Sequence, residues 1–216
     1  MDGYIVADLA DEAVVPSLRG AVATLVDYRD WFDPLRSLKV PGVHNQKNAA
    51  AALAAAAQVG IKAEEAAAAL ANFTGTWRRF EYKGIVNGAK VYDDYGHHPT
   101  EITATIKGAR ELYPDKKITL VFQSHTYTRT NELFKDFVTA LETADQVYVL
   151  PIYAARETNL SGVTHTALAQ AVGDKAEALP DFVSVVSKVK SLVGEDDIVL
   201  VMGAGDVTEI ANRLVS

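Results

Sequence analysis

From about residue 83 onward, short apolar runs alternate with longer amphipathic segments, and this rhythm constrains the fold more than any other feature of the chain. The run Ile198-Val199-Leu200-Val201 is apolar at every position, so both of its faces must be buried. Strands of that kind lie in parallel sheets that helices cover on both sides. Residues 83–216 are therefore predicted to form a doubly wound, mostly parallel α/β domain.

The elements of this domain follow from propensity and from the positions of breakers. Strands are expected at Lys90–Asp93, Lys117–Phe122, Gln146–Leu150, Ala176–Leu179 and Asp197–Met202. Helices are expected at Pro99–Leu112, Asn131–Leu141, Thr164–Ala171, Phe182–Leu192 and Val207–Leu214. The first of these helices carries proline in its first turn, where its missing N–H costs nothing.

Residues 1–82 have a different pattern and are predicted to form an incomplete α/β unit. Strands are expected at Tyr4–Ala7 and Val22–Val26, and helices at Asn45–Val59 and Ala63–Asn72, with Asn45 as an N-cap and Gly60 as a C-terminal stop. So few strands cannot easily close a sheet. We therefore expect an exposed sheet edge or apolar face in this unit, and self-association or local mobility there.

Composition excludes several classes of partner. The net charge is −7 and the basic residues are scattered, which argues against a nucleic-acid-binding surface. Cysteine is absent, so there is neither a disulfide framework nor thiolate chemistry. The absence of disulfides fits a location in the reducing cytoplasm. The N-terminus lacks the regions of a signal peptide. The alanine-rich run is too short to span a bilayer, so no membrane partner is expected.

Two polar clusters follow successive strands of the predicted sheet. The first is Asp93-Asp94-Tyr95-Gly96-His97-His98-Pro99-Thr100-Glu101, and the second runs from Phe122 to Thr130. Open α/β sheets bind ligands at the carboxyl ends of their strands, so the two clusters are expected to form one site. Successive strand residues point to opposite faces, so only one of the two aspartates is expected to face the ligand. That carboxylate can accept ribose hydroxyls, hold a cation, or satisfy local backbone groups.

Several cationic side chains in these clusters can act on a ligand. His97 and His98 can cap the following helix, bind a metal or contact an anion, and a third imidazole, His125, lies in the second cluster. Arg129 can form a bidentate pair with a carboxylate or phosphate, or a surface ion pair. Arg78-Arg79 can contact a phosphate or remain solvated. The spacing matches no metal-binding motif, so no metal site is predicted.

Other segments point to a nucleotide. Asn45 and Asn48 lie one helical turn apart, where they can bond a base edge or cap the helix. Gly203-Ala204-Gly205-Asp206 permits a tight turn and close approach to a ligand. No Gly-Lys pair occurs in the chain, so it contains no Walker A loop to hold a nucleotide triphosphate.

Taken together, six segments resemble the Mur ligase family in their order and spacing, and they cover nearly the whole chain from about Val40 onward. They are residues 42–49, 78–80, 93–101, 122–130, 153–157 and 203–206. Members have a UDP-substrate domain, a central P-loop ATPase domain and a C-terminal Rossmann-like domain. The resemblance implies that residues 1–82 are the C-terminal part of the central ATP-binding domain, and that residues 83–216 are the C-terminal domain.

The resemblance also implies an activity and roles for named residues. The expected reaction joins L-alanine to UDP-N-acetylmuramate through an acyl phosphate, with ATP and Mg²⁺. Asn45 and Asn48 would contact adenine, Arg79 the nucleotide and Asp94 its ribose. Tyr95, His97, His125 and Arg129 would face the muramoyl carboxyl and the alanine. The attacking amine must lose a proton, and the chemistry of an imidazole side chain allows His97 or His125 to accept it. Without the P-loop and UDP-substrate domains, the chain by itself is expected to be inactive.

One departure and three alternatives stand beside this hypothesis. Relatives often have Pro-His-Arg where this chain has Ser124-His125-Thr126, and Arg129 is expected to compensate only in part. A murein-peptide recycling ligase of the same family tends to have Phe-Ala in place of Tyr95-Gly96. A metal-dependent hydrolase would use Asp94, His97, His98 and His125. The third alternative is a non-catalytic binding module.

Overall fold

The computed structural model describes residues 3–34, 36–40 and 42–216, and the chain divides into an N-terminal unit, Met1–Thr74, and a C-terminal unit, Gly75–Ser216. The division lies before the residue 82 boundary expected from the sequence. The reason is that the segment preceding that boundary packs on the second unit: the ring of Phe80 stacks on Tyr92 at 4.3 Å, and Arg78 donates to the carbonyl of Gly205. Whether the first unit belongs to an ATP-binding domain stays a prediction.

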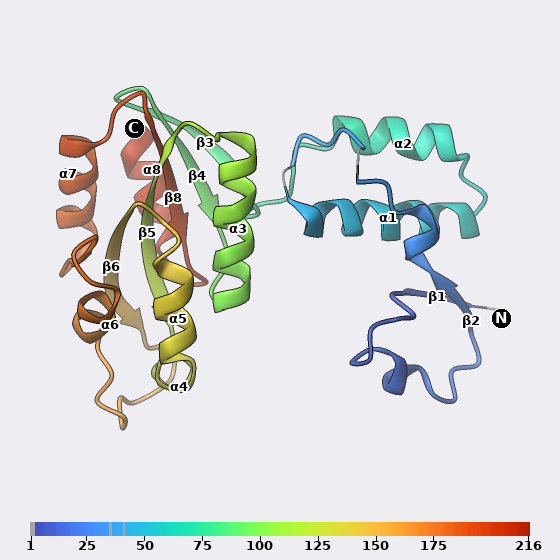
Figure 1. Cartoon of the computed structure of the whole chain (residues 1–216), viewed down its shortest axis with the longest axis horizontal. Helices are drawn as coiled ribbons and strands as arrows, with labels where there is room; N and C mark the ends of the chain where they lie inside the picture. The colour runs from blue at the N-terminus through green and yellow to red at the C-terminus, as the bar shows by residue number, and fades with distance from the viewer. Residues whose placement is uncertain (1–2, 35, 41) are drawn as a thin grey trace. The chain divides into compact units, whose positions relative to one another are not determined.

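A six-stranded sheet forms the centre of the C-terminal unit (Figure 1). The strand order is β3-β4-β8-β5-β6-β7, and every neighbouring pair is parallel except the β3–β4 hairpin. The strands are β3 Glu81–Val86, β4 Ala89–Asp94, β5 Lys117–His125, β6 Gln146–Tyr153, β7 Ala176–Ala178 and β8 Asp197–Met202. The predicted doubly wound, mostly parallel α/β class is confirmed.

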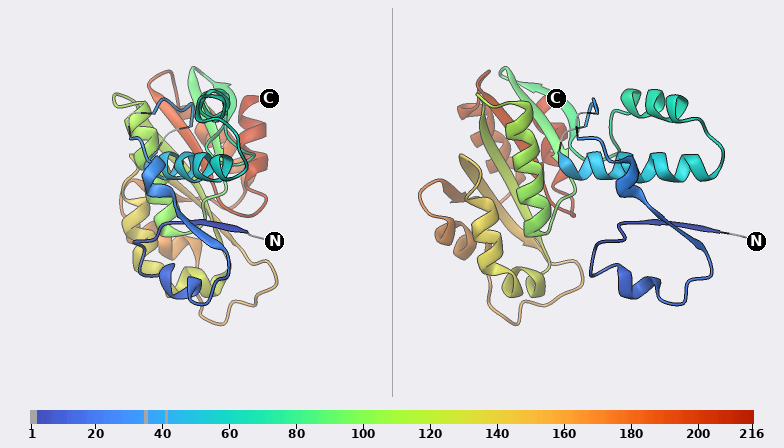
Figure 2. Two further views of the ribbon diagram at one scale, coloured as in Figure 1. Left: turned by 90° about the vertical axis from the view of Figure 1, so that its right-hand side faces the viewer. Right: turned by 45° about the vertical axis from the view of Figure 1, so that its right-hand side comes forward.

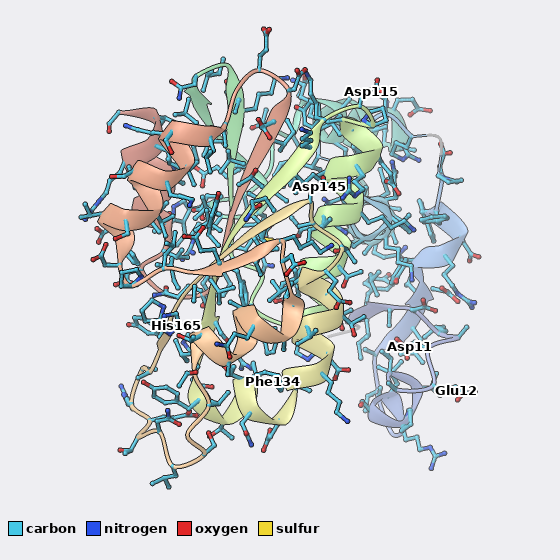
Figure 3. All side chains as sticks on the ribbon, turned by 60° about the vertical axis from the view of Figure 1, so that its left-hand side comes forward. Asp11, Glu12, Asp115, Phe134, Asp145 and His165 are labelled. Atoms are coloured by element: carbon cyan, nitrogen blue, oxygen red, sulfur yellow. The ribbon has the colours of Figure 1, made fainter. Side chains whose placement is uncertain are left out.

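Helices cover both faces of this sheet and enclose two hydrophobic cores. One core lies under α3 (Pro99–Leu112), α5 (Phe134–Leu141) and α6 (His165–Val172), and the other under α7 (Phe182–Leu192) and α8 (Thr208–Val215). Figure 3 labels Phe134 and His165, the first residues of α5 and α6. In β5, Phe122 faces the first core and Val121 the second, which is why these strands read as apolar throughout.

The largest differences between the observed and the predicted elements of the C-terminal unit lie in three places, while β4, β7, α6 and α8 differ by one residue at one or both ends. Strand β3 was not predicted, although the Asn87-Gly88 pair between β3 and β4 is a hairpin signal. Strands β5 and β6 each extend three residues beyond the predicted ends, to His125 and Tyr153. The predicted helix Asn131–Leu141 is divided at Leu133 into α4 (Tyr127–Glu132) and α5, because Leu133 leaves helical geometry at ψ 22°. Helices α3 and α7 and strand β8 have the predicted bounds.

The N-terminal unit contains a parallel pair of short strands and a helical hairpin. Strand β1 (Tyr4–Ala7) pairs with β2 (Thr24–Asp27), and each is followed by a 3₁₀ turn, at Val15–Leu18 and Tyr28–Trp31 respectively. Helix α1 (Val43–Gln58) is followed by α2 (Ala63–Asn72), which runs back alongside it (Figure 2). The N-cap of α1 is Gly42, so Asn45 lies inside the first turn and the predicted capping role is wrong. Among the described residues, no helix is long and apolar enough to cross a membrane.

Candidate functional site

The carboxyl ends of four strands meet at one edge of the large sheet. Strand β4 is paired with β8, β8 with β5, and β5 with β6, all in parallel, so their following loops emerge side by side. These loops carry the two polar clusters predicted from the sequence, the glycine-rich segment and the residues after Tyr153. The structure therefore gathers both clusters at one edge, where doubly wound sheets bind ligands.

A buried ion pair lies beneath this edge. Arg78 is 3 % exposed and its Nε lies 3.2 Å from Oδ2 of Asp93, which is fully buried, although the N–H is not aligned for a hydrogen bond. The guanidinium also donates to the carbonyls of Gly203 and Gly205. Thr208 Oγ1 donates to Asp93 Oδ2 at 2.6 Å. Arg78 is therefore neither a phosphate ligand nor a solvated charge, as the sequence had suggested, but a structural cation.

Asp94 is also buried, and its carboxylate serves the local backbone. Oδ2 accepts the N–H of Phe80 at 2.8 Å, and Oδ1 accepts the N–H of Gly96 at 2.7 Å. Burial raises the pKa of this carboxyl above its ordinary value of 3.8, against the opposing effect of the two N–H groups. Each oxygen keeps a second lone pair, so a ribose contact remains a prediction for a residue whose first role is structural.

The loop after β4 presents Tyr95 and His97 and uses His98 as a helix cap. His98 Nδ1 accepts the N–H of Thr100, and Glu101 accepts the N–H of His98, which together make a capping box at the start of α3. The His97 ring nitrogen Nδ1 lies 3.1 Å from the Tyr95 carbonyl and 3.7 Å from the Glu101 carboxylate. His98 is thereby occupied, and His97 remains available to a ligand.

Three aromatic rings from three strand ends lie in a row, the His125 ring stacked on Tyr153 and tilted at 58° to His97. The His125 ring lies on Tyr153, with centroids 5.5 Å apart, and 5.9 Å from the His97 ring. Burial lowers the pKa of His125 below its ordinary 6.5, and the charges of Arg129 and His97 lower it further. His125 Nδ1 is buried without a hydrogen-bond partner among the residues that the structure describes. The imidazole is therefore neutral at pH 7 and able to accept a proton.

Arg129 lies one helical turn beyond His125, on the short helix α4. Its Nη1 is buried and has no hydrogen-bond partner within the described part of the chain. A guanidinium nitrogen without an acceptor is costly, and an anionic ligand would supply one. Thr126, the residue immediately before α4, has φ 67°, an unusual value for a residue branched at Cβ.

The glycine-rich segment lies between the two neighbouring strand ends. A Cβ on Gly203 would meet the Gln123 carbonyl at 2.5 Å, and one on Gly205 would meet the Tyr153 ring at 2.8 Å. These positions therefore require glycine, as the close approach predicted from the sequence implies. Beyond Tyr153 a hollow of about 480 Å³ opens, with Gln123, Phe182 and Asp206 among the residues that line it.

The remaining predicted residues lie outside this cluster or stay untested by it. Asn45 and Asn48 lie in the first and second turns of α1, in the N-terminal unit. Arg79 is exposed, with its guanidinium 5.7 Å from the Tyr95 ring centroid. Over the part of the chain that is described, no three His, Asp or Glu side chains converge as metal ligands, so the hydrolase alternative has no geometric support.

Two residues of this region were missed as candidates, although they stand in a quoted segment. Tyr153 stacks on His125, and Glu157 accepts the N–H of Thr128 at 2.8 Å. The signal that could have found them was strand length: an end of β6 at Tyr153 rather than Leu150 places the segment beside β5.

Comparison with known proteins gives a consistent result. The model of the family described as Mur ligase, glutamate ligase domain, matches residues 78–205. The UDP-N-acetylmuramate–L-alanine ligase of Acidithiobacillus ferrooxidans is 43% identical over 188 residues, covering 86% of this chain and 40% of that protein. The ligase of the same name from Paenarthrobacter aurescens is 47% identical over 171 residues, covering 79% and 37%. The chain thus spans about 40% of the length of these relatives.

Solved structures agree with these relatives. The crystal structure of UDP-N-acetylmuramate-alanine ligase from Thermotoga maritima has a TM-score of 0.68 at 29% identity, covering 82% of this chain and 38% of that one. The folylpolyglutamate synthase of Mycobacterium tuberculosis, solved with ADP, has a TM-score of 0.69 at 17% identity and covers 98% of this chain and 53% of that one. The second likeness shows the fold alone.

Proposed function

The chain belongs to the Mur ligase family, and from that premise we propose that it is part of an ATP-dependent UDP-N-acetylmuramate–L-alanine ligase. The observation that carries the proposal is that the ends of β4, β5 and β6 bring His97, His125 and Tyr153 into one row beside Arg129. A cytoplasmic location is part of the same proposal, because the reaction consumes ATP.

The proposed chemistry begins at the muramoyl carboxylate, which ATP converts to an acyl phosphate. The α-amine of L-alanine then attacks the acyl carbon, and phosphate leaves. Arg129, with its unpartnered Nη1, is placed to hold an anionic oxygen of this group. The attacking amine must lose a proton, and neutral His125 is the side chain best suited to accept it.

Nucleotide and metal contacts belong to the proposal as well. Asn45 and Asn48 would contact adenine, Asp94 the ribose and the exposed guanidinium of Arg79 a phosphate. Mg²⁺ commonly binds through nucleotide phosphates, water and one or two carboxylates, so it requires no three-carboxylate cluster in this chain. Bound Mg²⁺ would neutralise the phosphate charge. Tyr95 is held by cation–π contacts from Arg78 and Arg79, and would face the muramoyl carboxyl and the alanine.

A chimaera tests the proposal. In it, this chain replaces the aligned segment of the Acidithiobacillus ferrooxidans ligase, to which it is 43% identical. We expect ADP release that depends on both UDP-N-acetylmuramate and L-alanine, and none from the 216-residue chain alone. A chimaera that is folded yet uses a murein tripeptide in place of L-alanine would favour the recycling ligase. A folded chimaera with neither activity would contradict the proposal.

Self-association of the isolated chain is a further expectation. No residue of β1 or β2 is buried, and Tyr4 and Leu25 are 50 % and 41 % exposed. A two-stranded sheet with exposed apolar side chains is marginal by itself and invites pairing with another copy. Sedimentation should show an apparent mass that rises with concentration, and Leu25→Lys should reduce the rise. The same change at exposed Val59, after α1, serves as the control; a concentration-independent monomer would refute the expectation.

A further inference from the structure

Helix α4 follows His125 directly and carries Arg129, yet it begins without a cap of its own. The first N–H groups of a helix need acceptors from outside the helix. The N-cap residue Thr126 makes no side-chain bond to the helix, because its φ of 67° and ψ of 144° turn the backbone out of the usual cap geometry. The acceptor must therefore come from elsewhere in the fold.

Glu157 supplies it from the loop after the neighbouring strand β6. Its Oε2 accepts the N–H of Thr128 at 2.8 Å, so a carboxylate stands at the positive end of the helix. The hydrogen bonds from the start of α4, that of the Thr128 N–H first, lower the pKa of Glu157 below its ordinary 4.5. The carboxylate is therefore ionised throughout the neutral range.

One backbone bond joins the two strand ends, and a second closes the turn that carries Glu157. The N–H of Thr126 donates to the carbonyl of Tyr153 at 2.9 Å, and the N–H of Glu157 donates to the carbonyl of Ala154 at 2.9 Å. The turn closed by the second bond contains Ala155 at φ 52°. Two non-glycine residues with positive φ, Thr126 and Ala155, persist only where their surroundings fix them. Glu157 joins the two segments that contain them.

We propose that Glu157 is a positioning residue: by capping α4 across two strand ends it fixes His125 and Arg129 in the orientation in which they meet the substrate. The part of this inference that concerns substrate rests on the proposed ligase function. The charged groups that act on His125 are Arg129 and His97, which oppose its protonation, and Glu157, which favours it. Glu157 thus orients the imidazole through α4 and also moderates its charge.

NMR titration and amide exchange on the chain itself test both effects. Glu157→Gln keeps an acceptor for Thr128 but removes the charge, so His125 should titrate at lower pH while α4 stays protected. Glu157→Ala removes both the acceptor and the charge, and exchange at Thr128 should also become roughly fivefold faster, as for loss of a helix cap. Glu132→Gln, an exposed carboxylate on the same helix, is the matched control and should change neither.

The ligase chimaera gives the third readout. Glu157→Ala should lower its kcat roughly tenfold, and Glu157→Gln should lie between Ala and the parent, because the cap is kept. Any one of three results would overturn the positioning role. They are an unchanged His125 titration in both variants, unchanged Thr128 exchange in Glu157→Ala, and unchanged kcat in Glu157→Ala. An inactive parent chimaera would count against the ligase function, and the NMR measurements would still decide whether Glu157 holds α4 and His125.

Discussion

Replacing Arg78 with methionine is expected to destabilise the C-terminal unit by about 3–5 kcal/mol, the usual cost of removing one partner from a buried ion pair. Arg78 is 3 % exposed and Asp93 is fully buried. The substitution leaves the Asp93 carboxylate with the Thr208 hydroxyl as its one donor in the described structure. It also removes the donors to the carbonyls of Gly203 and Gly205, so the glycine-rich segment should loosen.

The loss of stability in Arg78→Met should increase as pH rises. Burial raises the pKa of Asp93 above its ordinary 3.8, and the charge of Arg78 opposes that rise. Without Arg78 the folded-state pKa rises further, so the folded variant binds a proton that the unfolded chain releases. The stability that the protonated Asp93 carboxyl contributes is then fully present below its ordinary pKa of 3.8. It is lost as pH rises through the raised pKa of the folded variant. The deficit of Arg78→Met relative to the parent should therefore be larger at pH 8 than at pH 5.

Amide exchange in β8 is a suitable measurement, because its buried strand reports on opening of the whole unit. Arg110→Met is the matched control: Arg110 pairs with Asp145 (labelled in Figure 3) at 3.1 Å, but both side chains are about 40 % exposed. An exposed pair contributes up to about 1 kcal/mol. The double variant Arg78→Met with Asp93→Asn should recover part of the loss. If Arg78→Met cost no more than Arg110→Met, the buried pair would have no special weight.

The parts of the fold that the sequence predicts are those whose limits are set locally. Helix α3 has the predicted bounds because Pro99 and the capping box around His98 fix its start. Strand β8 has the predicted bounds because its apolar run stops at Gly203. Strand β5 extends beyond its predicted end, since its last three residues, Gln123 to His125, are polar and their sequence indicates a loop. They belong to the strand because the neighbouring β6 continues alongside them, and pairing of that kind is not visible locally.

The candidate site shows the same division. The rule that ligands bind at strand ends brings the two polar clusters together without any knowledge of contacts. The roles within the clusters depend on contacts between distant residues. Arg78 and Arg79 are neighbours in sequence, yet one is buried against Asp93 and the other is exposed. Whether each of these arginines has a structural or a binding role depends on its burial, and their spacing in the sequence does not reveal that burial.

Replacing His125 with glutamine in the ligase chimaera is expected to lower kcat by about 10²–10⁴-fold, the range typical of general acid–base catalysis. The KM for UDP-N-acetylmuramate should change far less, because the proton is transferred only as the amine attacks. The sequence alone left His97 and His125 as equal candidates for this role. Burial beside Arg129 and His97 keeps His125 neutral, whereas one ring nitrogen of His97 already faces the Tyr95 carbonyl.

The two imidazoles can be separated by three variants and a pH profile. His97→Gln should cost less than His125→Gln, and His98→Asn, at a residue engaged in capping α3, serves as the control. The acidic limb of kcat/KM should follow the His125 titration, so Arg129→Gln should move that limb to higher pH, because the guanidinium opposes protonation of His125. A loss for His97→Gln that exceeds the loss for His125→Gln would assign the proton to His97. The buried, unpartnered His125 nitrogen would then serve to hold the ring against Tyr153 rather than to receive a proton.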